Sequence, residues 1–260
     1  MKKAAIISNI KQAKDIQEYI DAYLLPLKDL SINYPNTFSL EDIKKLKDLN
    51  KEIFIILNKN IHNSEVEKLK KALIEIEKLN ISGIFFYDIA IPNLKQKLNL
   101  KVPLVWSEEH LTTNYGTVNY WYDKNVKYAY LSSELTKREI DEIKNNTKSK
   151  LFVNVFGYIP MFTSQRHLVN NYLETFNLKS KHNNFIEKEG KKYPIIDTNL
   201  GTTVYSNYIL NALDIDLKVD YLVFNSTFIN DKDFIEVLKN ENKFPKETGF
   251  LYKETIYKVK

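Results

Sequence analysis

Polar and aromatic side chains follow several short apolar runs of this chain, and their types suit acid–base chemistry or the binding of a polar ligand. They are Asn58, Asp88, Trp106 with Ser107 and Glu108, Ser132 with Glu134, and the run from Asn154 to Tyr158. A carboxylate that ends an apolar strand costs free energy unless a partner compensates it. Asp88 and Glu134 are therefore the strongest catalytic candidates among them, whereas Ser132 is better explained as a helix cap.

An adjacent arginine and histidine stand in "GYIPMFTSQRHLV" (157–169), which opens with one of only six glycines in the chain. A guanidinium presents a planar fork of donors that suits a carboxylate or a phosphate. Glycine reaches backbone angles that a side chain blocks, so Gly157 would let the chain leave a strand at a sharp angle. We add Arg166 and His167 to the catalytic candidates. The candidates for substrate binding are Asn58, Trp106, Asn154, Gly157 and Tyr158.

Several kinds of catalysis are excluded by motifs that the sequence lacks. It has no GxSxG, HExxH or P-loop spelling, and its four histidines (62, 110, 167 and 182) show no helical ligand spacing. It also has no cysteine, which excludes thiolate catalysis, disulfides, and cysteine-bound zinc or iron–sulfur clusters. We therefore expect no metal site and no cofactor.

The elements that must position these residues alternate between short apolar runs and longer stretches of helical period. The runs are residues 4–8, 27–32, 52–57, 83–88, 103–107, 127–132, 151–156 and 220–225. They are apolar on both faces, as strands of a buried parallel sheet are. Capping-box spellings at Ser39 and Thr136 predict the starts of two of the intervening helices. Eight such strands favour an α/β fold, a (β/α)8 TIM barrel, and the missing Gly-rich turn after the first strand argues against a dinucleotide-binding sheet.

One gap in the alternation is too long for a strand–helix unit. More than sixty residues separate Phe156 from Asp220, and "KKYPIIDTNLGTTVYSN" (191–207) predicts a β-hairpin around Asn199 to Gly201. We predict a single barrel domain over residues 1–260, with an insertion of about residues 157–215 between the seventh and eighth strands. The insertion would emerge at the carboxyl face, where barrel enzymes place their chemistry.

The composition predicts an ordinary globular protein. The formal net charge is +5, and the lysines are spread over predicted helix faces, which favours a solvated surface over a nucleic-acid footprint. The apolar stretch near the N-terminus is too short for the usual core of a signal peptide, and no run approaches the roughly 18 apolar residues of a membrane helix. We expect a cytoplasmic protein with no membrane association.

Four stretches resemble peptidase family U32, the collagenase-like proteases. They are residues 83–94, 112–143, 157–169 and 193–207, in the family's order and spacing. The resemblance implies a barrel-like fold. It also implies a choice of functions. Members were first named peptidases, whereas others take part in hydroxylating pyrimidines in transfer or ribosomal RNA, or in oxygen-independent hydroxylation of quinones. The residues that carry over are Asp88, Asn114, Glu134, Gly157 and Arg166, and Asn114 thereby joins the substrate-binding candidates.

The chain departs from the family at the cysteines that bind an iron–sulfur cluster in the hydroxylating members. Pro160 or Met161 stands at the first of these positions and His167 at the next. Short members of this kind resemble companion proteins of Firmicutes that accompany a longer, cysteine-containing paralogue. The resemblance thus implies a cluster-free companion in 5-hydroxylation of the tRNA wobble uridine, with that paralogue and tRNA as partners.

Two alternatives remain open at this level. A peptidase would need an activated water, for which a metal held by Asp88, Glu134 and His167 is one route. A non-catalytic binding barrel would keep the fold without the chemistry. The 17 tyrosines and 14 phenylalanines could stack bases, although core packing accounts for most aromatics.

Overall fold

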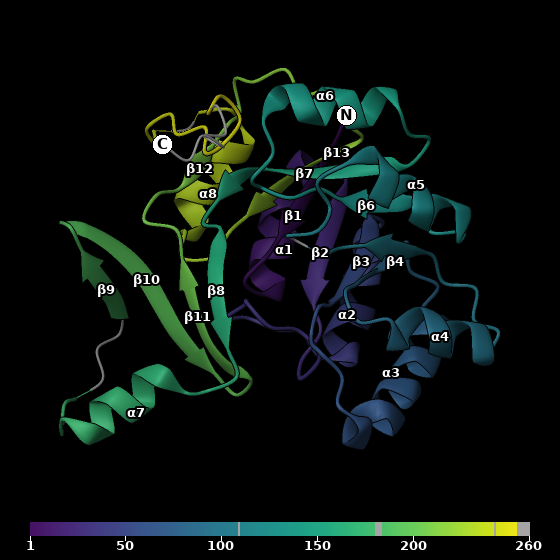
Figure 1. The fold of residues 1–260 in the computed structure, drawn as a ribbon, viewed down its shortest axis with the longest axis horizontal. Helices are drawn as coiled ribbons and strands as arrows, with labels where there is room; N and C mark the ends of the chain where they lie inside the picture. The colour runs from purple at the N-terminus through teal and green to yellow at the C-terminus, as the bar shows by residue number, and fades with distance from the viewer. Residues whose placement is uncertain (109, 180–183, 242, 254–260) are drawn as a thin grey trace, which may run out of the picture.

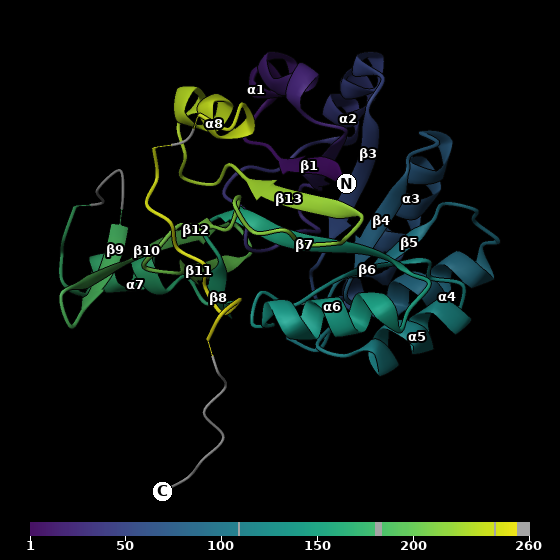
Figure 2. The same ribbon diagram turned by 90° about the horizontal axis from the view of Figure 1, so that it is seen from above.

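The computed structural model describes residues 1–108, 110–179, 184–241 and 243–253, and it contains a closed barrel of eight parallel strands (Figures 1 and 2). The strands are β1 (Lys2–Ile6), β2 (Ala22–Pro26), β3 (Glu52–Leu57), β4 (Gly83–Phe86), β5 (Leu104–Trp106), β6 (Tyr128–Tyr130), β7 (Lys150–Gly157) and β13 (Tyr221–Asn225). The last strand, β13, pairs with both β1 and β7, and β6 pairs with β7, so the barrel has no free edge. The predicted (β/α)8 fold is confirmed.

Helices on the outside of the barrel follow seven of the eight strands. They are α1 (Ile10–Ile16), α2 (Leu40–Leu46), α3 (Val66–Lys78), α4 (Ala90–Lys97), α5 (Tyr115–Asp123), α6 (Lys137–Asn145) and α8 (Asp231–Leu238), and short 3-10 turns adjoin them at Gln17–Tyr19, Lys47–Leu49 and Asn63–Glu65. Both predicted capping boxes are present, since the Ser39 and Thr136 side chains accept bonds from Asp42 N and Glu139 N. Of the described helices, none combines the length and apolar character needed to cross a bilayer.

The second strand lies five residues earlier than the sequence predicted. Residues 22–26 form β2, all of them buried between β1 and β3, whereas 27–32 lie in the loop that leads to α2. Leu27 and Leu30 are buried in that loop, which is why the segment has the apolar content of a strand. Asp29 has a positive φ of 66°, which does not fit a strand. The prediction of 27–32 as a strand was therefore wrong.

The inside of the barrel is filled with side chains, many of them aromatic. Every second residue of a strand points inward, and these residues form one buried cluster: Ala4, Ile6, Ala22, Leu24, Phe54, Ile56, Phe85, Val105, Tyr130, Phe152, Tyr221 and Val223. The rings of Phe152 and Tyr221 stack at 4.0 Å between centroids. A ligand could therefore enter only above this filled interior, at the mouth of the barrel.

The insertion stands where the seventh helix would be. It contains β8 (Pro160–Ser164), α7 (Leu168–Thr175), β9 (Asn184–Lys188), β10 (Lys191–Thr198) and β11 (Gly201–Tyr205). Its four strands form an antiparallel sheet in the order β8-β11-β10-β9, and the short β12 (Leu210–Asn211) then pairs with β7. Figure 1 shows β8 and β11 beside the barrel, with α7 and β9 farther out. The predicted hairpin is β10–β11, within a larger sheet.

Candidate functional site

A cavity of about 320 Å³ lies at the mouth of the barrel. This is the lower end of the usual ~300–1,000 Å³ range of ligand pockets. Its floor consists of the uppermost inward-facing residues of five strands: Ile6, Leu24, Ile56, Phe85 and Tyr130. The position is the carboxyl end of a parallel barrel, where catalytic and binding residues of this fold are found.

Polar residues from three neighbouring strand ends form one wall of this cavity. Asn58, Tyr87 and Ser107 each lie two positions beyond an inward-facing residue of their strand, so the alternation of the strand carries them to the mouth. The Asn58 side-chain oxygen Oδ1 accepts a hydrogen bond from Ile32 N at 2.9 Å. This bond joins the wall to the loop after β2.

Glu108 supplies a buried carboxylate to the same cavity. The residue is 9% exposed, and its Oε2 accepts from Leu111 N at 2.5 Å. Its carbonyl oxygen accepts from both the amide and the hydroxyl of Thr112. These bonds fix the turn after β5 and hold Glu108 in place. Among the described residues that line the cavity, Glu108 is the one carboxylate.

The insertion and the loop after β2 cover the mouth from the other side. Pro160 to Thr163 of β8 line the cavity together with Asn33 and Tyr34. The Asn33 side-chain oxygen accepts from the hydroxyls of Thr163 (2.5 Å) and Thr203 (3.2 Å), and its carbonyl accepts from Tyr205 Oη at 2.8 Å. Asn33 therefore connects the insertion to the barrel directly beside the cavity.

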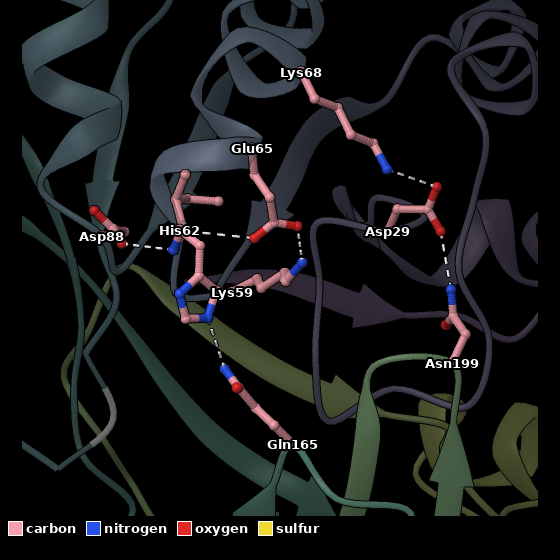
Figure 3. Close-up of polar contacts among 9 residues, drawn as sticks. Asp29, Lys59, His62, Glu65, Lys68, Asp88, Gln165 and Asn199 are labelled. Atoms are coloured by element: carbon pink, nitrogen blue, oxygen red, sulfur yellow. Dashed lines mark hydrogen bonds and ion pairs between the residues drawn. The ribbon is translucent and has the colours of Figure 1, made fainter.

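A second cavity of about 530 Å³ adjoins the first and opens between β3 and the insertion. Figure 3 shows its polar contacts, including the ion pair of Lys59 with Glu65 and the 3.4 Å contact of His62 Nε2 with Gln165 Nε2. The hydrogen bond from Lys59 lowers the pKa of Glu65. Asn199 at the hairpin tip donates to Asp29 at 3.0 Å. The two cavities share three lining residues, Ile32, Tyr87 and Thr163.

Two of the predicted polar residues lie at the barrel mouth with defined partners. Asn58 lines the first cavity, as described above. Asn154 accepts from Tyr130 Oη at 2.6 Å and donates to Ser133 Oγ at 2.9 Å. Asn154 therefore orients Tyr130, a residue of the cavity floor.

Asp88 is satisfied by backbone donors of the barrel rim. Its two carboxylate oxygens accept from Ile61 N and Ala90 N, each at 2.8 Å. The first bond ties the loop after β3 to the end of β4, as Figure 3 shows, and the second supports the start of α4. These bonds compensate the carboxylate without a ligand.

Trp106 lies on the opposite side of its strand from the cavity. The side chain is 7% exposed and packs outside the barrel, where its ring stacks on Trp121 of α5 at 4.6 Å. Val105 is the inward-facing residue of β5, so Trp106 must face out. This corrects the predicted position of Trp106 at the mouth: the structure places it in the packing between sheet and helix.

The remaining polar candidates are exposed at the surface. Glu134 follows β6, with Oε1 at 3.9 Å from His110 Nδ1. Arg166 and His167 precede α7 in the insertion, and Asn114 caps α5 by accepting from Thr117 N. No three His, Asp or Glu side chains among the described residues are grouped to hold a metal ion. The set Asp88, Glu134 and His167 is thus not brought together, and His182 lies outside the described residues.

Gly157 and Tyr158 stand where β7 passes into the insertion. Gly157 has a φ of +120°, and a Cβ there would lie 2.5 Å from the carbonyl oxygen of Asn225 on β13. This requirement for glycine agrees with the predicted sharp exit from the strand. The Tyr158 ring packs edge-on against Phe228 at 5.7 Å, and burial raises the pKa of its hydroxyl.

Several cavity residues were missing from the predicted set. Tyr87 lies two positions beyond the inward-facing Phe85, so strict use of the strand alternation would have found it in place of Asp88. Asn33, Tyr34 and Phe162 come from a loop and from the insertion, and no sequence pattern relates them to the barrel mouth.

Comparison with known proteins decides the family. The model of peptidase family U32 matches residues 8–220. The chain belongs to peptidase family U32. It is 26% identical to tRNA hydroxylation protein P2 of Bacillus subtilis (strain 168), over 99% of this chain and all of that protein. It is 23% identical to tRNA hydroxylation protein P of Escherichia coli (strain K12), over 58% of this chain but only 33% of that protein. The second relative is therefore much the longer protein.

A solved structure from Aquifex aeolicus VF5 is similar in fold. It aligns with a TM-score of 0.50 and 12% identity, over 95% of this chain and 93% of that chain. At this identity the likeness concerns the fold alone.

The residues of this U32 chain do not fit an iron–sulfur cluster. Such clusters are held by cysteine thiolates, and the chain has none. At the positions expected for ligands, Met161 is 54% exposed on β8 and His167 lies at the exposed start of α7. We therefore derive no step through a cluster bound to this chain.

Proposed function

We propose that this U32 protein takes part in the hydroxylation of a tRNA uridine as a companion that binds substrate, while another protein supplies the redox chemistry. The observation that carries the proposal is the match over essentially the whole chain to tRNA hydroxylation protein P2. The mouth cavity supports it, because it combines aromatic side chains with hydrogen-bonding groups, as the binding of a planar heterocycle requires. We propose a cytoplasmic location, where tRNA is available.

The partner proposed is a longer, cysteine-containing member of the same family. Conversion of a uridine C5–H to C5–OH is an oxidation, and a chain without cysteines or a grouped metal-ligand set has no redox centre of its own among the described residues. The partner would hold the cluster, and this chain would hold the base. The wobble position of the uridine stays a prediction.

Deletion of the gene tests the proposal. Nucleoside mass spectrometry of tRNA from the deletion strain should show the loss of 5-hydroxyuridine and its derivatives, and reintroduction of the chain should restore them. Unchanged 5-hydroxyuridine in the deletion strain would overturn the proposal. Purification of the tagged chain from its own cell should recover a cysteine-containing family member, and recovery of the chain alone would refute the companion role.

The peptidase alternative has no observation of the site in its favour beyond the family's description. The suggested metal set is dispersed, as described above. Deletion of a non-catalytic binding barrel would abolish hydroxyuridine only if its binding were needed for the hydroxylation. Such a barrel would then be the companion proposed above.

A further inference from the structure

The mouth cavity combines features that select for a neutral planar ligand. Among the described residues that line it, five are aromatic: Tyr34, Phe85, Tyr87, Tyr130 and Phe162. None of these lining residues is a lysine or an arginine, and the one histidine among them, His110, is exposed, with its Nδ1 3.9 Å from the Glu134 carboxylate. Aromatic side chains stack on any base. The cavity therefore suits a base and leaves the phosphates outside.

The polar groups of the cavity suit one base better than another. An ionised carboxylate only accepts hydrogen bonds, and a side-chain amide nitrogen only donates them. Glu108 uses Oε2 for Leu111 N, and among the described residues no donor bonds its Oε1. Asn58 uses its Oδ1 for Ile32 N, and no acceptor among the described residues bonds its Nδ2. Glu108 and Asn58 thus present one acceptor and one donor at the cavity.

Uracil is complementary to this pair. It presents an N3–H donor between two carbonyl acceptors, whereas cytosine presents an N3 acceptor and an amino donor at the same edge. A carboxylate facing N3 would bond uracil and repel the N3 lone pair of cytosine.

We propose that the mouth cavity receives a uracil base extruded from single-stranded RNA, with the Glu108 carboxylate accepting its N3–H and the Asn58 amide donating to a neighbouring carbonyl. This inference rests on the proposed function and names the residues that select its substrate. The base lies over the aromatic floor, with Phe162 of the insertion beside it. The backbone of the RNA then leads into the second cavity, which adjoins the first and is lined by polar groups of both the barrel and the insertion. Extrusion of the target base is the usual solution when chemistry must reach an atom inside a stack.

Binding of two short RNAs by the full chain tests the inference. The probes are single-stranded RNA pentamers, labelled at one end, that differ only in a central U or C, and anisotropy is measured at one fixed salt concentration because phosphate contacts depend on salt. The affinity of the wild-type chain for the U pentamer should exceed its affinity for the C pentamer by about tenfold or more. This is the effect expected of one hydrogen bond to a charged group.

Two variants separate recognition of the base edge from stacking. Glu108→Gln keeps the size and an oxygen for Leu111 N, but turns an amide toward the base, so the preference for U should vanish or reverse. Phe162→Ala changes a side chain that is 53% exposed, so folding should be retained, and binding of both pentamers should weaken about tenfold with their ratio unchanged. Glu142→Gln, at an exposed position of α6, is the matched control and should behave as wild type.

Equal binding of the two pentamers by the wild-type chain, absence of binding, or a preference for U that survives Glu108→Gln would each overturn the inference. These failures are distinct from failure of the proposed function. Loss of hydroxyuridine on gene deletion without any preference for U in vitro defeats only the inference. A preference for U together with normal hydroxyuridine in the deletion strain defeats only the proposed function.

Discussion

Replacement of Gly157 by alanine should destabilise the barrel strongly. The backbone there has a φ of +120°, and a new Cβ would lie 2.5 Å from the Asn225 oxygen and 2.8 Å from the Asn225 Cβ. Both neighbours belong to the rigid, paired strand β13, so they cannot move aside cheaply. The unfavourable backbone angle costs about 1–3 kcal/mol and the overpacking about 1–3 kcal/mol. We expect the free energy of unfolding to fall by about 4 kcal/mol.

Gly190→Ala is the matched control for the backbone contribution. Gly190 also has a positive φ, +72°, but nothing lies within 4 Å of a Cβ built there. Its substitution should cost only the conformational part, about 1–2 kcal/mol. The difference of roughly 2–3 kcal/mol between the variants measures the close approach of β7 and β13.

Urea unfolding, followed by both far-UV circular dichroism and tryptophan fluorescence, gives the two values if the transitions coincide. A Gly157→Ala variant within 1 kcal/mol of wild type, or equal to Gly190→Ala, would refute the described junction between strand and insertion. Because Asn225 also donates to the Tyr158 carbonyl at 3.4 Å, the same variant should loosen the insertion at its base.

Three further variants test separate parts of the structure. Asn33→Gly keeps the favourable backbone at φ 68° but removes the oxygen that bonds the insertion, so limited proteolysis should cut the insertion faster, with stability lower by about 1–3 kcal/mol. The pKa of Glu65 is lowered by the hydrogen bond from Lys59, so the stability it contributes is present above its unfolded value near 4.5 and is lost as the pH falls through the lower folded value. Glu65→Gln should therefore flatten this acid loss in urea melts at pH 3 to 6. Trp106→Phe should lower stability while leaving the affinity for the U pentamer within twofold, because the ring lies outside the barrel.

One result for each of these three variants would contradict the role given to its side chain. Unchanged proteolysis of the Asn33 variant would remove its role in holding the insertion. An acid transition that is identical in Glu65→Gln would show that other carboxylates set it. A large loss of RNA affinity in Trp106→Phe would return that residue to the cavity.

The capping motifs and apolar runs of the sequence predict the barrel well because the elements that they indicate are the ones that pair and pack in the fold. The capping spellings at Ser39 and Thr136 mark true helix starts, and seven of the eight apolar runs overlap true strands. The exception was 27–32, where leucines buried beneath a loop imitate a strand. The true second strand, β2 (Ala22–Pro26), ends in a proline and is absent from the predicted strands.

The site was predicted only in part, for a reason that concerns side-chain direction. A residue at a strand end lies inside or outside the barrel according to the two-residue alternation, and a shift by one position exchanges the faces. This separates Asn58, which lines the cavity, from Trp106, which faces the helices. The covering residues Asn33 and Phe162 meet the cavity only through the tertiary fold, so no local pattern could identify them.

The measurement that tests the central claim most directly is the 5-hydroxyuridine content of tRNA from a strain that lacks the native chain and carries a replacement. The wild-type chain and Glu142→Gln should restore the modified nucleosides, and Glu108→Gln, expressed at the same level, should not. Full restoration by Glu108→Gln, or normal content without any replacement, would contradict the account of the barrel mouth as the site that holds the uridine.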